Sequence, residues 1–214
     1  MFVDLLVIGT AITLGPLHNS AFILMLSARG GVRKGLAFIL AWFANLALVI
    51  AAVMLLTGGK PPAHGSAPST AALSVKLAVG AGLVIYGAHR RRRPPGPHRP
   101  PKWLAKLDGL SGWTAAGLAF LLQPWAMVGA GAASALDADL SSVAATLALI
   151  GYCLLATASL LVMEVYTARS PAAAQDRLGH LRGWLDTHQE QLIVRLSLVV
   201  GLWLVGHSIY QLVS

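Results

Sequence analysis

Six long apolar stretches constrain this chain more than any other feature of its sequence. They run from about 2 to 27, 36 to 57, 71 to 88, 113 to 133, 143 to 167 and 192 to 213. Each is close to the roughly 20 residues that a helix needs to cross the hydrocarbon core of a bilayer. Only 11% of the 214 residues are charged and 56% are hydrophobic, which excludes an ordinary soluble domain. The sequence therefore predicts an all-α integral membrane protein with six transmembrane helices.

The two ends of the chain need separate interpretation. The first stretch has no basic residue before it and is too long for the apolar core of a signal peptide, so we expect a retained helix. Residues 170–191 are polar, but Leu178, Leu181, Trp184 and Leu185 recur at helical spacing. This pattern predicts an amphipathic helix near 171–187, lying at the membrane interface before the last span.

The positions of the basic residues predict the orientation of the chain. Thirteen of the 16 Lys and Arg residues fall in the first, third and fifth loops, whereas the other two loops carry only Lys60 with Asp137 and Asp139. Because basic loops remain in the cytoplasm, we expect a multi-pass protein of the plasma membrane with both termini outside. The charge of +8 is explained by these loops, so we expect no nucleic-acid partner. The Pro-rich connector 90–110 reads as a flexible linker, with binding of anionic lipid headgroups as an added role.

The two halves of the sequence resemble each other. Residues 76–87 and 195–206 align at a constant offset of 119, and the first span of each half contains a proline, Pro16 or Pro124. With three spans in each half, the second half enters the membrane in the opposite sense. We therefore predict two inverted three-helix repeats, at 1–89 and 111–214, around the connector; chance similarity of apolar helices is the alternative.

Polar residues next to these prolines are the best candidates for a substrate path. Pro16 removes a hydrogen bond from the Ile12 carbonyl, which must find another partner or line a wet cavity. Polar side chains follow it in an apolar segment, where they are costly unless they meet partners. They line a path for a substrate or simply join helices by hydrogen bonds. Adding the second break and two polar positions in other spans, the candidates are Pro16, His18, Asn19, Ser20, Asn45, Gln123, Pro124 and Glu164.

Other polar positions support fewer conclusions. Glu164 is either a proton-coupling carboxylate or the partner of a basic loop residue, and we favour the partner role. Lys76 and Arg195 are expected to extend from helix ends to the interface, and His207 to lie there. Cys153 stands alone, and no nucleophile elbow, phosphate-binding loop or metal-spaced cluster is present. We therefore expect neither an enzyme nor a bound metal or cofactor.

The sequence resembles the LysE-type transporter superfamily, and most closely the GAP proteins, also called the Sap or sulfolipid-addressing group of actinobacteria. The resemblance rests on the stretch from Gly15 to Ser20, the turn from Ser27 to Phe38, the Gln123-Pro124 pair, and segments 176–185 and 201–206. The chain departs from the group at His18-Asn19, and it lacks a proline within 162–165.

The resemblance implies export. Members of the group are thought to help to move envelope glycolipids to the cell surface, and relatives in the wider superfamily export amino acids or ions. We expect a transport protein that exports an envelope (glyco)lipid or small amphiphile. The alternatives are an accessory protein of a lipid export or synthesis complex, or an exporter of small amino acids or ions. Expected partners are membrane lipids, an envelope-lipid transporter or synthase, and a second copy of the chain.

Overall fold

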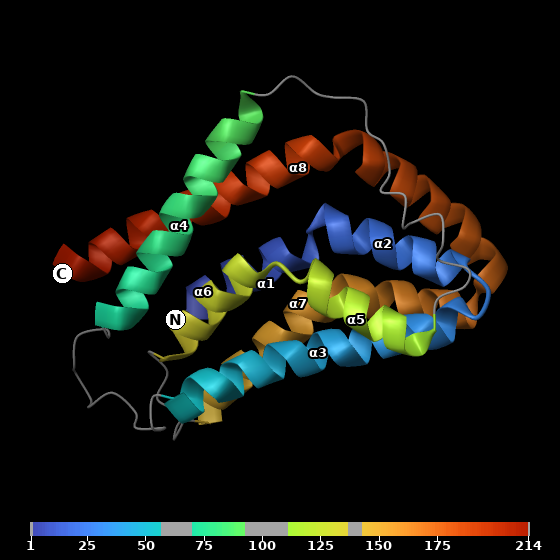
Figure 1. Ribbon diagram of the computed structural model, residues 1–214, viewed down its shortest axis with the longest axis horizontal. Helices are drawn as coiled ribbons and strands as arrows, with labels where there is room; N and C mark the ends of the chain where they lie inside the picture. The colour runs from blue at the N-terminus through green and yellow to red at the C-terminus, as the bar shows by residue number, and fades with distance from the viewer. Residues whose placement is uncertain (1, 57–69, 93–110, 137–142, 214) are drawn as a thin grey trace.

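The computed structural model describes residues 2–56, 70–92, 111–136 and 143–213, and within these ranges the chain forms helices without any strand (Figure 1). The predicted loop around Lys60, the connector beyond Arg92, and the loop with Asp137 and Asp139 lie outside the described residues. The helices are α1 (Phe2–Thr13), α2 (Pro16–Ser27), α3 (Gly31–Leu56), α4 (Thr70–Arg91), α5 (Gly112–Leu122), α6 (Trp125–Leu136), α7 (Val143–Arg169) and α8 (Pro171–Val213).

The lengths of these helices fit a membrane protein. Four of them, α3, α4, α7 and α8, are long and apolar enough to cross a bilayer. The pairs α1–α2 and α5–α6 are bent by 47° and 69°, and counting each pair as one span raises the total to six. With a rise of 1.5 Å per residue, the arms of these pairs extend over about 33 Å and about 28 Å from end to end. Each bent pair is therefore about as long as a bilayer core is thick.

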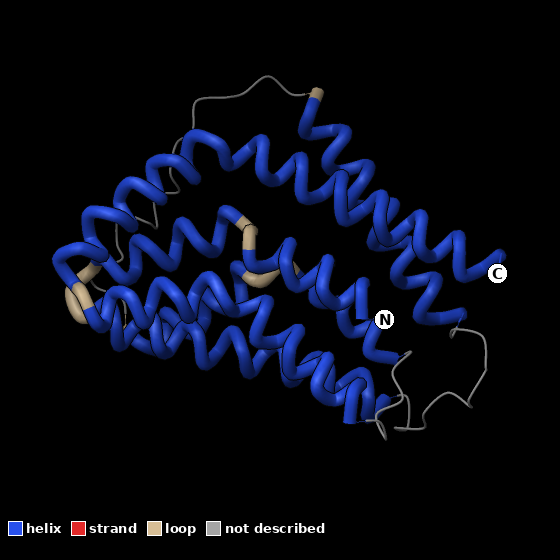
Figure 2. The backbone as a smooth tube through the Cα atoms, turned by 180° about the vertical axis from the view of Figure 1, so that it is seen from behind, coloured by secondary structure: helices blue, strands red, loops and turns tan. Residues whose placement is uncertain are grey.

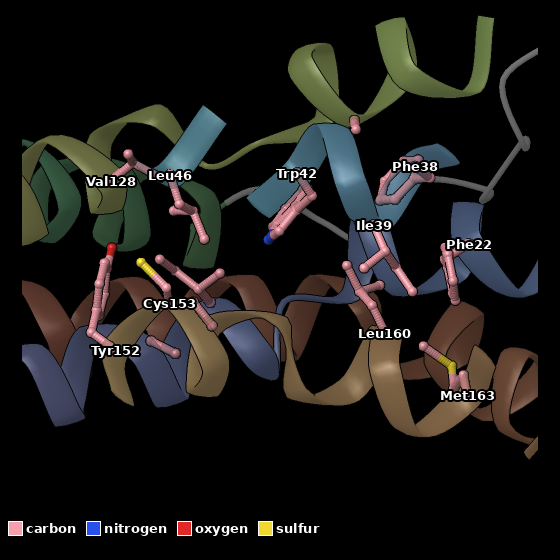
Figure 3. Packing of buried hydrophobic residues seen from close by; sticks show 14 of the residues in the cluster. Phe22, Phe38, Ile39, Trp42, Leu46, Val128, Tyr152, Cys153, Leu160 and Met163 are labelled. Carbon is pink, nitrogen blue, oxygen red and sulfur yellow. The ribbon is translucent and has the colours of Figure 1, made fainter. Parts of the chain in front are cut away.

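Apolar side chains occupy both the interior and the surface of the bundle. Figure 3 shows the packed interior, where Trp42 is fully buried and stacks on Phe38 at a ring-centroid distance of 5.8 Å. On the outside, large side chains such as Leu48, Ile85 and Val199 are each more than 60% exposed. A water-soluble protein would not carry so much exposed apolar surface, whereas lipid tails solvate it well.

Equivalent helices of the two halves have equivalent neighbours. Helix α1 packs on α7 as α5 packs on α3, and α2 packs on α8 as α6 packs on α4. The helices α3 and α7 also contact each other, as do α4 and α8. Figure 1 shows that α1–α2 and α5–α6 run in opposite directions, and so do α3 and α7. Exchanging the two halves therefore preserves most of the packing.

Helices α4 and α8 cross where small residues allow their backbones to meet. A side-chain carbon at Gly201 would lie 2.7 Å from the carbonyl oxygen of Gly80, and one at Gly80 would lie 3.0 Å from that of Gly201. Neither position accepts a larger residue without moving a helix, because the obstacle is backbone. The crossing holds the last helix of each half together.

Helix α8 differs from the sequence expectation. We expected an amphipathic helix near 171–187 and a separate last span from 192, but one continuous helix covers Pro171–Val213 (Figure 2). The four intervening residues, His-Gln-Glu-Gln, contain no glycine or proline that would end a helix. The break between α2 and α3, in contrast, contains Gly30 at φ 70°, a left-handed conformation that glycine adopts without strain.

Candidate functional site

The first break separates α1 from α2 at Leu14 and Gly15. The N–H of Gly15 donates to the Ile12 carbonyl at 3.0 Å, and so replaces the donor that Pro16 lacks. Of the two outcomes expected for this carbonyl, the structure shows another partner. A side chain at Gly15 would collide with the imidazole of His18, so the tight turn and the buried histidine depend on each other.

Hydrogen bonds of the Asn19 side chain connect the break to a neighbouring helix. Its Nδ2 donates to the carbonyl oxygens of Thr13 and Gly15, each at 2.8 Å, and its Oδ1 accepts from the hydroxyl of Ser159 on α7 at 2.8 Å. Thr13 also hydrogen-bonds through its hydroxyl to the Leu155 carbonyl of α7. Because both amide hydrogens of Asn19 are engaged, its side chain acts as a structural bridge with little capacity left for a ligand.

At the second break, between α5 and α6, a different group replaces the missing hydrogen-bond donor. Pro124 leaves the Phe120 carbonyl without its usual donor, and the indole Nε1 of Trp125 donates to it at 3.1 Å. The backbone N–H of Trp125 donates to the Gln123 carbonyl at 2.9 Å. The rings of Phe120 and Trp125 pack edge to face, and these residues are 52% and 40% exposed, whereas Gln123 is only 3% exposed. The polar side chain therefore points into the bundle and the aromatic pair toward the lipid.

Several buried polar atoms near the breaks have no hydrogen-bond partner in the described part of the chain. They include Nε2 of His18, Oγ of Ser20, and both Oε1 and Nε2 of Gln123. The ring of His18 lies 4.7 Å from that of Trp42, whose Nε1 is also unpartnered. A buried polar atom without a partner costs about 1–3 kcal/mol. These atoms keep unused hydrogen-bonding capacity, whereas the amide group of Asn19 is engaged within the protein.

The two remaining candidates lie further along α3 and α7. Asn45 is half-buried one turn beyond Trp42, and its Nδ2 has no partner among the described residues. Glu164 is buried against Gly35 of α3, and its Oε2 is unpartnered in the same sense. It lies about 7 Å along α7 from Ser159. We expected Glu164 to pair with a basic loop residue, but the described residues show no such pair for it.

A comparison with protein families identifies the family of the chain. The family model described as Sap, sulfolipid-1-addressing protein, matches residues 5–210. The chain belongs to the Sap family. The matched range of this Sap-family protein includes both breaks, all of the candidate residues, and the α4–α8 crossing. No curated protein and no solved structure matches the chain.

The Sap-family chain also contains a buried charge cluster that sequence reasoning missed. Asp4 of α1 and Lys76 of α4 are 0% and 1% exposed, and Oδ2 of Asp4 lies 3.3 Å from Nζ of Lys76. From α8, Trp203 donates its indole N–H to Oδ1 of Asp4 at 3.2 Å, and Nε2 of His207 lies 3.6 Å from the same oxygen. The expectation that Lys76 reaches the interface is therefore wrong, because a carboxylate inside the bundle holds its ammonium group.

This cluster ties together three helices at the end of the molecule that carries the N-terminus. Asp4 lies in the first turn of α1 and Lys76 in the second turn of α4. The sequence contained a signal for this pair, since the three spans predicted for the first half place the starts of the first and third spans at the same membrane face. Two opposite charges there, each in an apolar segment, favour pairing with one another over exposure to lipid.

Proposed function

We propose that this Sap-family protein is a multi-pass transport protein that moves an envelope lipid or small amphiphile across the plasma membrane. The cargo's polar group would bind between the halves, which expose the site alternately to the two faces. The observation that carries the proposal is the set of unpartnered polar atoms of His18, Ser20 and Gln123, buried beside two proline breaks. Broken helices and buried polar atoms at membrane depth are typical of transporter binding sites.

The arrangement of the helices supports six spans in two inverted repeats. Bends of 47° and 69° leave each broken pair extended, whereas a re-entrant loop would have to turn back on itself. The broken pairs run in opposite directions, and α1 contacts α6 while α2 contacts α5 (Figure 1). Two neighbouring halves that can rock against each other about such breaks are what alternating access requires.

The surroundings of the unpartnered atoms favour an amphiphilic cargo. His18 lies at the end of an aromatic row that continues through Trp42, Phe38 and Phe22, with ring centroids less than 6 Å apart. A polar group next to a long apolar wall suits a molecule with a polar head and a hydrocarbon tail. The family's description as a sulfolipid-1-addressing protein agrees with a lipid of this kind.

We further propose that both termini lie outside the cell. Figure 1 shows the two termini at one end of the molecule and the α2–α3 and α7–α8 turns at the other. Those two turns carry Arg29, Arg33 and Arg169, which the positive-inside rule places in the cytoplasm.

Reconstitution of the purified protein tests the proposal. We expect vesicles with wild-type protein to move a fluorescent single-chain lipid between leaflets, and Gln123→Leu to reduce the rate at least about tenfold, because binding loses its amide. The matched control is Gln191→Leu, at an exposed position of α8, which should transport normally. Transport by Gln123→Leu at the wild-type rate would remove the breaks from the mechanism.

A second candidate function is that of an accessory protein for an envelope-lipid transporter or synthase. The observation that favours it is the exposure of Leu181 and Trp184, by 41% and 50%, on the first part of α8, whose other large apolar residues, Leu178 and Leu185, are buried. The same vesicles separate the two functions. Lipid movement by the protein alone supports the carrier, whereas movement only after addition of a partner supports the accessory role.

A further inference from the structure

A cavity lies at the end of α4, far along the chain from the proline breaks. Its volume is about 360 Å³, and the described residues that line it are Ala88, Arg91 and Arg92 from α4 and Leu198 from α8. Pockets that hold a small ligand group begin at about this volume. The lining is unusual in composition, because it combines two guanidinium groups with two apolar side chains.

The arginines of the cavity have no counter-charge from the described part of the protein. The preceding Arg90 is engaged, since its Nη1 lies 2.8 Å from both carboxylate oxygens of Glu190 and its guanidinium lies 5.5 Å from the Tyr86 ring centroid. Arg91 and Arg92 are exposed, and neither side chain forms an ion pair or hydrogen bond with another described residue. Two adjacent unpaired guanidinium groups favour an anion with several oxygen atoms, such as a phosphate or sulfate ester.

The position of the cavity favours a lipid headgroup over a free ion. The membrane-spanning part of α4 ends at Arg91, so the two arginines stand at headgroup level. Helical spacing places Ile85 on the same face as Ala88 and Arg92, and Leu202 on the same face as Leu198. Ile85 and Leu202 are 69% and 61% exposed. An apolar track therefore leads from the arginines toward the middle of the bilayer along both helices.

We propose that this cavity binds an anionic membrane lipid, with its phosphate or sulfate ester on Arg91 and Arg92 and its acyl chains along Ile85 and Leu202. This site is separate from the transport path and does not depend on the proposed transport. Since α4 and α8 are the last helices of the two halves, a lipid bound here contacts both halves at once. Basic pockets between membrane helices are well suited to such lipids.

The test measures lipid retention and not transport. Full-length protein is purified from mixed micelles that contain equal amounts of phosphatidylglycerol and phosphatidylcholine, and the lipids that remain bound are counted by native mass spectrometry. We expect wild-type protein to retain phosphatidylglycerol, and Arg91→Gln/Arg92→Gln to retain about tenfold less of it. The control Arg29→Gln/Arg33→Gln makes the same change of charge at two exposed arginines of the α2–α3 region and should retain it as wild type does.

Two further arms distinguish a lipid site from a site for a free anion or from general attraction of anions to a basic surface. Ala88→Trp keeps both arginines but fills the cavity, and it should lose phosphatidylglycerol while remaining folded by circular dichroism. Inorganic phosphate at about 10 mM should not displace the lipid, because it lacks the acyl chains that contribute to binding. The proposal is overturned if the arginine variant and its control lose equal amounts of bound phosphatidylglycerol. It is also overturned if Ala88→Trp retains phosphatidylglycerol as wild type does, or if phosphate alone displaces this lipid.

Discussion

The ion pair between Asp4 and Lys76 gives the sharpest prediction about stability. Replacing Lys76 by Met leaves a carboxylate that is 0% exposed without its ammonium partner at 3.3 Å. Breaking a buried pair from one side typically costs 3–5 kcal/mol. Because Trp203 and His207 still contact Asp4, we expect a loss near the lower end, about 3 kcal/mol. That value corresponds to roughly a 150-fold change in the unfolding equilibrium constant.

The double variant Asp4→Asn/Lys76→Met separates the pair from the effect of substitution alone. Removing both charges also removes the desolvation penalty, so we expect its stability within about 1 kcal/mol of wild type. The assay is reversible unfolding by sodium dodecyl sulfate in mixed micelles, followed by circular dichroism. Arg33→Met, at an exposed position, is the control and should change stability by less than about 0.5 kcal/mol. A double variant as unstable as Lys76→Met, or a harmless Lys76→Met, would refute this reasoning.

Three other predictions use the same unfolding assay. Gly201→Ala should lower the free energy of unfolding by about 2 kcal/mol, because its new side-chain carbon would meet a backbone carbonyl of α4. Gly206→Ala, whose new carbon would face open space, should leave the free energy of unfolding unchanged. Equal effects of the two substitutions would contradict the close crossing of α4 and α8. Asn19→Ala should lower the free energy of unfolding by about 2–3 kcal/mol, because the carbonyl oxygens at the first break lose their donor. An unchanged stability would argue against Asn19 as a structural bridge. Gln123→Leu should be as stable as wild type or more stable, because neither polar atom of its side chain has a partner among the described residues; marked destabilisation would show that the amide is structural.

The proline breaks could be predicted from the sequence because their cause is local. A proline lacks an N–H, so the positions of Pro16 and Pro124 identify which carbonyls lose a donor. The group that replaces the donor could not be predicted in the same way. At Ile12 it is the N–H of Gly15, and at Phe120 it is the indole of Trp125, and the choice depends on bend angles and rotamers that only the folded chain fixes.

Side-chain roles that depend on tertiary contacts were harder to predict. Asn19 stood out as a polar residue inside an apolar segment, but only the structure shows that both its amide hydrogens are engaged. Lys76 was expected at the interface because lysine stems can extend there, and the nearby Asp4 reverses that preference. The burial of His18 and Gln123 agrees with what the sequence indicated, since polar groups avoid lipid when a bundle interior can hold them.

The central claim is that the chain crosses the membrane six times in two halves of opposite orientation. It is tested most directly by labelling single cysteines in intact cells with a membrane-impermeant maleimide, in a Cys153→Ser background. We predict labelling at positions 2 and 143, and protection at positions 29 and 111 until the cells are permeabilised. Labelling of 2 and 29 from the same face, or of 111 and 143 from the same face, would make a bent pair a re-entrant loop and would contradict the account.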